Sequence, residues 1–199
     1  MVAGSSPATG TNRYELICQT IGDYMIIFLD TEFSSLIKAE CEILSIGMVS
    51  EDGQHSLYVE RNDYRRDACS DFVVKSVLPL FGRIPESQCS LQELNIRVLN
   101  FLRAVGTYPT MACDSSYDSC LLYVAMRNAE MTEGPGPLLS QSINLNDYTS
   151  HPAFEKAFNA HFCDGRDLHH ALWDAQALRA GYLAYMNFQK LMRLREDVE

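Results

Sequence analysis

The chain has 199 residues, a formal net charge of −10 and 47% hydrophobic residues. This length and apolar content suffice for one domain with a sizeable core. The acidic balance argues against a protein that coats nucleic acid, because such domains are usually basic. It does not exclude a protein that holds a few phosphates through bound cations, because the cations reverse the local charge.

The beginning of the chain differs in composition from the rest. Residues 1–24 open with Gly, Ser and Pro and contain no continuous apolar segment. We therefore expect a disordered leader rather than a signal peptide, followed by a single domain over 25–199. No apolar run approaches the roughly 20 residues of a membrane span. Seven cysteines without a Cys-x-x-Cys pair predict free thiols in a cytoplasmic protein.

Short apolar segments predict five strands. The continuous run over 25–29 is typical of a strand buried on both faces. The next two strands are predicted over 42–49 and 56–60, and Glu51-Asp52-Gly53-Gln54 between them is a hairpin turn signal. Two more are predicted over 110–113 and 139–145.

Helical spacing of apolar residues predicts helices over 71–80, 90–105, 117–128, 153–162 and 170–195. The second of these begins with Ser90-Leu91-Gln92-Glu93, which matches a capping box. Three strands followed by alternating helices and strands predict an α/β fold, with a mixed five-stranded sheet flanked by helices.

Two carboxylates stand at the end of the first predicted strand. Because strand side chains alternate, Asp30 and Glu32 point to one face and Thr31 to the other. Such a pair can share a divalent metal ion, although a strand that simply ends in solvent would look the same. A third carboxylate, Asp118, opens the helix predicted over 117–128, where a capping role is the alternative. Asp114, four residues earlier, is a competing candidate.

A histidine and a fourth carboxylate lie near the start of the last predicted helix. His169 and Asp174 are five residues apart, so they would not share a face if both were in mid-helix. They can converge if His169 lies on the preceding loop and Asp174 one turn into the helix. Histidine titrates near neutrality, which suits a general base, and His170 is the rival for that role. Four carboxylates and one imidazole are suited to two divalent metals and phosphodiester hydrolysis.

Three segments, in this order, resemble the sequence blocks of the DEDDh 3′–5′ exonuclease superfamily. They are Leu29-Asp30-Thr31-Glu32-Phe33, Tyr117-Asp118 and His169-His170-Ala171-Leu172-Trp173-Asp174-Ala175. The resemblance covers about residues 25–190 and implies a ribonuclease H-like fold. It also implies that four carboxylates hold two Mg²⁺ or Mn²⁺ ions and that His169 is the catalytic base. These ligands would be Asp30, Glu32, Asp118 and Asp174.

Within the superfamily, the chain looks most like small bacterial 3′–5′ exoribonucleases. This implies stepwise release of 5′-mononucleotides from an RNA 3′ end. Many relatives have a Gly-His-Asn run where this chain has Ala112-Cys113-Asp114, which leaves DNA open as the substrate. An inactive nuclease-like binding module is the second alternative. We expect Phe33 and the neighbouring backbone from Thr31 to Ser34 to contact the terminal nucleoside, because aromatic stacking tolerates any base. The expected partner is nucleic acid and not a membrane, and a homodimer is left open.

Overall fold

A computed structural model describes residues 25–36, 41–106, 108–139, 142–163 and 165–196. The leader predicted over residues 1–24 lies outside the described residues. Within them, no helix has the length and apolar character needed to cross a bilayer. The six cysteines in the described part of the chain are all unpaired, as the sequence predicted.

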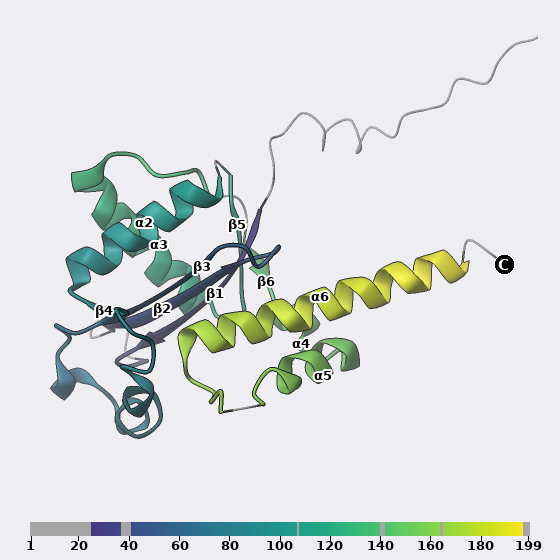
Figure 1. Ribbon diagram of the computed structural model, residues 1–199, viewed down its shortest axis with the longest axis horizontal. Coiled ribbons are helices and arrows are strands. Elements are labelled where there is room, and N and C mark those ends of the chain that lie inside the picture. The colour runs from purple at the N-terminus through teal and green to yellow at the C-terminus, as the bar shows by residue number, and fades with distance from the viewer. Residues whose placement is uncertain (1–24, 37–40, 107, 140–141, 164, 197–199) are drawn as a thin grey trace, which may run out of the picture.

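A mixed six-stranded sheet forms the centre of the fold, with the order β4-β3-β2-β1-β5-β6 (Figure 1). The strands β1 (Ile26–Phe33), β2 (Ile43–Ser50) and β3 (Ser56–Arg61) form an antiparallel meander. Gly53 supplies the positive φ of 74° in the turn between β2 and β3. The other half of the sheet is parallel, because β5 (Thr110–Cys113) pairs with β1 and β6 (Ile143–Asn144) pairs with β5.

The predicted number of five strands is wrong by one. The additional strand, β4 (Gln88–Cys89), pairs in parallel with the end of β3. Two residues are too few to show the alternation by which a strand is recognised in a sequence. The strand predicted over 139–145 is likewise reduced to the two residues of β6 in the described part of the chain.

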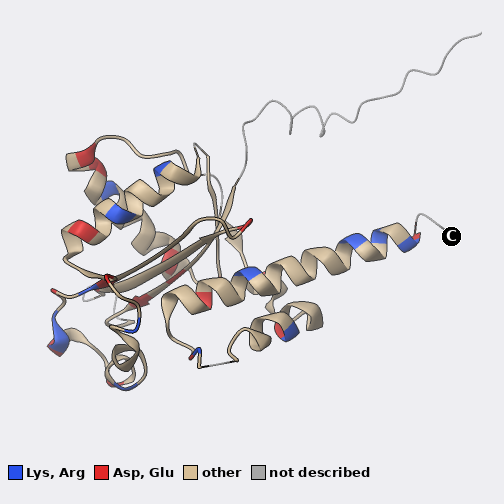
Figure 2. Ribbon diagram, viewed as in Figure 1, with Lys and Arg blue, Asp and Glu red and all other residues tan. Residues whose placement is uncertain are grey.

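Helices cover both faces of the sheet (Figure 1). One face carries α2 (Leu91–Val105) and α3 (Ser116–Glu133), and the other carries α4 (Asn146–Thr149), α5 (Pro152–Ala160) and α6 (Ala171–Glu196). The Ser90 hydroxyl accepts a hydrogen bond from the Glu93 backbone N–H at 3.3 Å, as the capping box predicts. Figure 2 shows basic residues gathered toward the far end of α6, where they complement the helix dipole.

The segment predicted as a helix over 71–80 is helical but irregular. It contains a π-helix, η3 (Val73–Val77), and a 3₁₀ turn, η4 (Leu78–Leu80), and a further 3₁₀ turn, η2 (Arg66–Ala68), precedes it. Pro79 has no backbone N–H, so an α-helical ladder cannot continue through it. π-turns are rare and often lie at functional sites.

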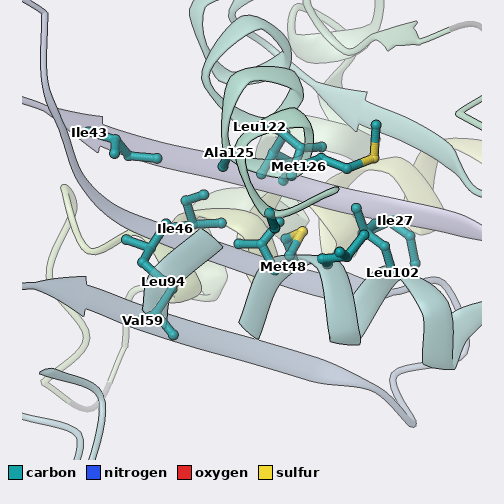
Figure 3. Close-up of a cluster of buried hydrophobic side chains, with 14 of the residues drawn as sticks. Ile27, Ile43, Ile46, Met48, Val59, Leu94, Leu102, Leu122, Ala125 and Met126 are labelled. Carbon is teal, nitrogen blue, oxygen red and sulfur yellow. The ribbon is translucent and has the colours of Figure 1, made fainter. Parts of the chain in front are cut away.

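Alternate residues of β1 pack into two separate cores. Ile27 and Leu29 belong to the cluster beneath α2 and α3, part of which is drawn in Figure 3. Phe28 belongs to the cluster that contains Leu178 and Tyr182 of α6. The alternation therefore places Asp30 and Glu32 on the α6 face of β1 and Thr31 on the α3 face.

The start of α6 rests directly on the backbone of β2 at Gly47. A Cβ atom at Gly47 would lie 2.2 Å from the backbone carbon and oxygen of Ala171 and 2.3 Å from the Leu172 nitrogen. Gly47 also pairs with Asp30 in the sheet. Because Gly47 has no side chain, the first turn of α6 can pack directly against β2, the strand next to β1.

We expect Gly47→Ala to lower both stability and any activity that depends on the first turn of α6. The added methyl group must displace helix backbone, and overpacking of this kind costs about 1–3 kcal/mol. Gly181→Ala is the matched control, because its Cβ would lie 2.7 Å from the Phe154 ring, remote from that turn. Thermal melts should show both variants destabilised. Unchanged affinity for Mn²⁺ in Gly47→Ala would show that the packing of α6 on Gly47 does not position the predicted metal ligands.

Candidate metal centre

The four predicted carboxylates meet at the end of β1, although they lie far apart in the sequence. Asp30 and Glu32 come from β1 itself. Asp118 and Asp174 each lie in the first turn of a helix, α3 and α6 respectively. The positive ends of two helix dipoles therefore point toward this cluster of negative charge.

The first group of converging side chains consists of Glu32, His169 and Asp174, which we call the His169 triad. One ligand atom from each residue lies within 4.8 Å of those from the other two, and none of the three side chains is exposed. The His169 backbone N–H donates to Asp174 Oδ2 at 2.8 Å. The predicted convergence of loop and helix is confirmed, since α6 begins two residues after His169.

His169 is held in an unusual backbone conformation. Its φ of 70° lies in the left-handed region, which non-glycine residues rarely adopt. The edge of its imidazole meets the ring of Phe72, with centroids 4.9 Å apart. Because such strain persists only where the surroundings impose it, the hydrogen bond to Asp174 is central to the position of His169.

The second group consists of Asp30, Asp114 and Asp118, which we call the Asp118 triad. Its three carboxylates also have oxygens within 4.8 Å of one another. Asp118 is 1% exposed, and its Oδ1 accepts hydrogen bonds from Thr31 Oγ1 at 2.6 Å and Thr31 N at 3.2 Å. These two bonds fix the carboxylate of α3 to the middle of β1.

His170, the rival for the role of base, is part of the core. It is 1% exposed and is stacked between Tyr58 and Trp173, with ring centroids 4.2 Å and 4.0 Å away. Burial lowers the pKa of His170 to about 4, with a smaller contribution from the positive charge of Arg83. The neutral, enclosed ring favours His169 as the proton acceptor.

The carboxylates of the two triads hold their protons unusually strongly. Burial raises the pKa of Glu32 to about 8, and the nearby charges of Asp174 and Asp118 add to the effect. Burial also raises the pKa of both Asp118 and Asp174 to about 7, partly offset by their hydrogen bonds. The pKa of Asp30 lies well above its ordinary value, because burial acts together with repulsion from the surrounding carboxylates. A cation would remove this cost.

Each triad also contains a buried carboxylate oxygen with no hydrogen-bond partner in the described part of the chain. Asp118 Oδ2 and Asp174 Oδ1 accept no hydrogen bond from any residue that the structure describes. Buried polar atoms are seldom left unpaired, so each of these oxygens fits the contact surface of an ion. Carboxylates are the ligands that Mg²⁺ and Mn²⁺ prefer, and the donor set therefore fits a pair of such ions.

We expect the metal-free protein to lose stability as the pH rises from about 4 to about 8. An unfolded carboxyl group has a pKa near 4, whereas the folded pKa of Glu32 is about 8. The folded state binds more protons between these values, so the free energy of unfolding falls as the pH rises. Melting temperatures in EDTA across this range would check the trend, and Mn²⁺ should restore more stability at pH 8 than at pH 5.

The control for this measurement is the double variant Glu32→Gln with Asp174→Asn. Neither replacement titrates, so both the pH trend and the effect of Mn²⁺ should become smaller. A melting temperature in EDTA that rises from pH 5 to pH 8 in the unmodified protein would contradict the prediction.

An apolar cavity of about 450 Å³ opens beside the His169 triad. It is lined by Glu32, Phe33, Ser35, Leu36, Ser70, Phe72 and Val73. The Phe33 ring stacks on Tyr117 with centroids 5.3 Å apart. The cavity thus joins a carboxylate of the centre to an aromatic wall, an arrangement common in small-ligand sites.

The three residues expected to touch a nucleoside have different environments. Phe33 lines the cavity. Thr31 is 4% exposed and its side chain is bonded to Asp118, whereas Ser34 is fully buried and its Oγ accepts from the Glu42 N–H at 3.0 Å. Because the side chains of Thr31 and Ser34 are buried and hydrogen-bonded, they stabilise the structure of the site.

The sequence does not reveal two features of the centre, the approach of Asp114 to the other carboxylates and the contact of Phe72 with His169. Asp114 was set against Asp118 as an alternative, yet the structure brings both carboxylates together. The signal that could have found this is parallel pairing, since the carboxyl ends of parallel strands meet at one edge of a sheet. Phe72 had no comparable signal, because nothing in its local pattern places it against His169.

Comparison with protein-family models finds no match, and comparison with curated proteins finds none either.

Proposed function

We propose that this chain is a metal-dependent 3′–5′ exoribonuclease of the DEDDh type, built on a ribonuclease H-like fold. The observation that carries the proposal is the convergence of Asp30, Glu32, Asp118 and Asp174 with His169 at the end of one strand. The α/β architecture, with helices on both faces of a mixed sheet, is compatible with that fold. The three matching sequence blocks supply the same five residues in the same order.

The two triads divide the cluster into two places for a cation. Glu32 and Asp174 would hold one ion and Asp118 the other, with Asp30 close to both. When bound, such ions neutralise the carboxylates, lower the pKa of water and stabilise charge on a phosphodiester. The ions would thereby replace the protons that the buried carboxylates otherwise retain.

His169 would act as the general base. Its imidazole takes a proton from water as the water oxygen attacks phosphorus, and the bond from phosphorus to the 3′-oxygen breaks. The leaving 3′-oxygen gains a proton from solvent, and a 5′-mononucleotide is released.

The apolar cavity would accommodate the 3′-terminal nucleoside. Phe33 and Phe72 offer aromatic surface beside the cluster. Stacking of a base on an aromatic ring contributes about 1–3 kcal/mol and accepts any base. The cavity volume of about 450 Å³ lies within the usual range of small-ligand pockets, about 300–1,000 Å³.

The test is digestion of matched RNA and DNA oligomers, labelled at the 5′ end, with Mg²⁺ or Mn²⁺. We expect RNA to shorten by single nucleotides with release of 5′-mononucleotides, and EDTA to stop the reaction. Faster digestion of DNA would make the chain a deoxyribonuclease of the same kind. Binding of RNA without hydrolysis would support a binding module, and internal cleavage would contradict the proposed direction of attack.

A further inference from the structure

We infer that Asp114 is a fifth carboxylate ligand of the metal centre and completes the site that Asp30 and Asp118 begin. The inference rests on the proposed function only for the identity of the ion, a divalent cation such as Mn²⁺. It changes the composition of the second site, which would present three carboxylates instead of two. Such a site binds a divalent ion with a net negative charge remaining.

The backbone places Asp114 beside Asp30. β5 runs parallel to β1, with Phe28 paired to Ala112. Extending this register by two residues places Asp114 next to Asp30. Both carboxylates therefore lie at the C-terminal ends of neighbouring strands. This placement follows from strand pairing and does not depend on the conformation of a surface loop.

The peptide of Asp114 is fixed by the segment that follows β6. The Leu145 N–H donates to the Cys113 carbonyl at 2.9 Å, and Asn146 Nδ2 donates to the Asp114 carbonyl. On the other side, Ser115 is the N-cap of α3, and its hydroxyl accepts from the Tyr117 N–H at 3.1 Å. Asp114 is therefore held between two ordered segments, with its carboxylate within 4.8 Å of those of Asp30 and Asp118.

An independent observation at Asp118 indicates that an ion belongs at this place. Thr31 occupies Oδ1 of Asp118 with two hydrogen bonds. Oδ2 has no hydrogen-bond partner among the residues that the structure describes, although Asp118 is only 1% exposed. A buried carboxylate with one oxygen fixed and the other unpaired is a preorganised ligand. Asp114 is half-buried beside it and brings further negative charge to the same point.

The competing explanation is that Asp114 only stabilises the start of α3 through the helix dipole. That role would affect the melting temperature and leave the affinity for metal unchanged. Asp114→Asn separates the two explanations, because it keeps the volume and removes the charge. Asp114→Glu restores the charge on a longer side chain and serves as the second variant.

The experiment titrates each metal-free protein with Mn²⁺ and follows free Mn²⁺ by electron paramagnetic resonance at pH 7.5. We expect two bound ions in the unmodified protein. In Asp114→Asn the affinity for one of the two ions should fall by at least about tenfold, and Asp114→Glu should recover part of this affinity. Asp147→Asn is the matched control, since it removes an exposed carboxylate outside both triads and should bind as the unmodified protein does.

Unchanged Mn²⁺ affinity in Asp114→Asn, with a loss in Asp118→Asn, would overturn the inference. So would the absence of Mn²⁺ binding in the unmodified protein. Binding of two ions without hydrolysis of RNA would refute the proposed nuclease and leave the assignment of Asp114 intact. The binding measurement therefore distinguishes the failure of one proposal from the failure of the other.

Discussion

Asp30→Asn should lower the turnover of RNA by about a thousandfold or more, equivalent to about 4 kcal/mol in the activation barrier. Asp30 interacts with carboxylates of both triads, since Asp118, Asp174, Glu32 and Asp114 all contribute to the raised pKa of its side chain after burial itself. Its removal therefore disturbs both proposed ion sites at once. Asn has nearly the same volume, so the fold should survive.

The measurement is single-turnover hydrolysis of a labelled RNA at saturating Mn²⁺, with circular dichroism to verify the fold. Asp174→Asn should show a comparable loss, because Asp174 both joins the His169 triad and holds the His169 N–H. Asp147→Asn again serves as the control. More than about a tenth of the activity left in Asp30→Asn would mean a loss below ~1.4 kcal/mol, too small for a metal ligand.

His169→Ala should reduce turnover by roughly 10²–10⁴-fold, the usual contribution of a positioned general base. Binding of Mn²⁺ should persist, because the carboxylates remain.

His170→Phe is the control for the histidine experiment. A phenyl ring keeps the stack between Tyr58 and Trp173, so activity should remain near that of the unmodified protein. A His169→Ala variant with turnover near that of the unmodified protein would remove His169 from the role of base. A large loss of Mn²⁺ affinity in that variant would instead identify the imidazole as a metal ligand.

The parts of the fold that were predicted correctly have strong local signals. The buried strand over 25–29, the turn at Gly53 and the cap at Ser90 each depend on neighbouring residues, and each is found in the structure. The missed strand β4 has no such signal, because it exists only through pairing with β3. Local patterns predict elements well, whereas very short strands arise from tertiary pairing.

The candidate site follows the same division. His169 and Asp174 could be paired from the sequence because a loop and a helix start lie side by side along the chain. The position of Asp114 beside Asp30 depends on the register of β5 against β1, which no local pattern reveals. The backbone from Thr31 to Ser34 is expected to contact a nucleoside, whereas alternation along β1 turns the Thr31 side chain toward α3 and Asp118.

The metal centre lies between the two cores on either side of β1 and connects the helices that pack into them. Asp118 belongs to the helix packed into one core through Leu122, and Asp174 to the helix packed into the other through Leu178. Ions held between these carboxylates would act as a cross-link through the edge of the sheet. The free energy of ion binding would couple the unfolding of the two helical layers, because neither layer could unfold alone without releasing an ion. The concentration of divalent cation would then determine whether the protein unfolds in a single step or one layer at a time.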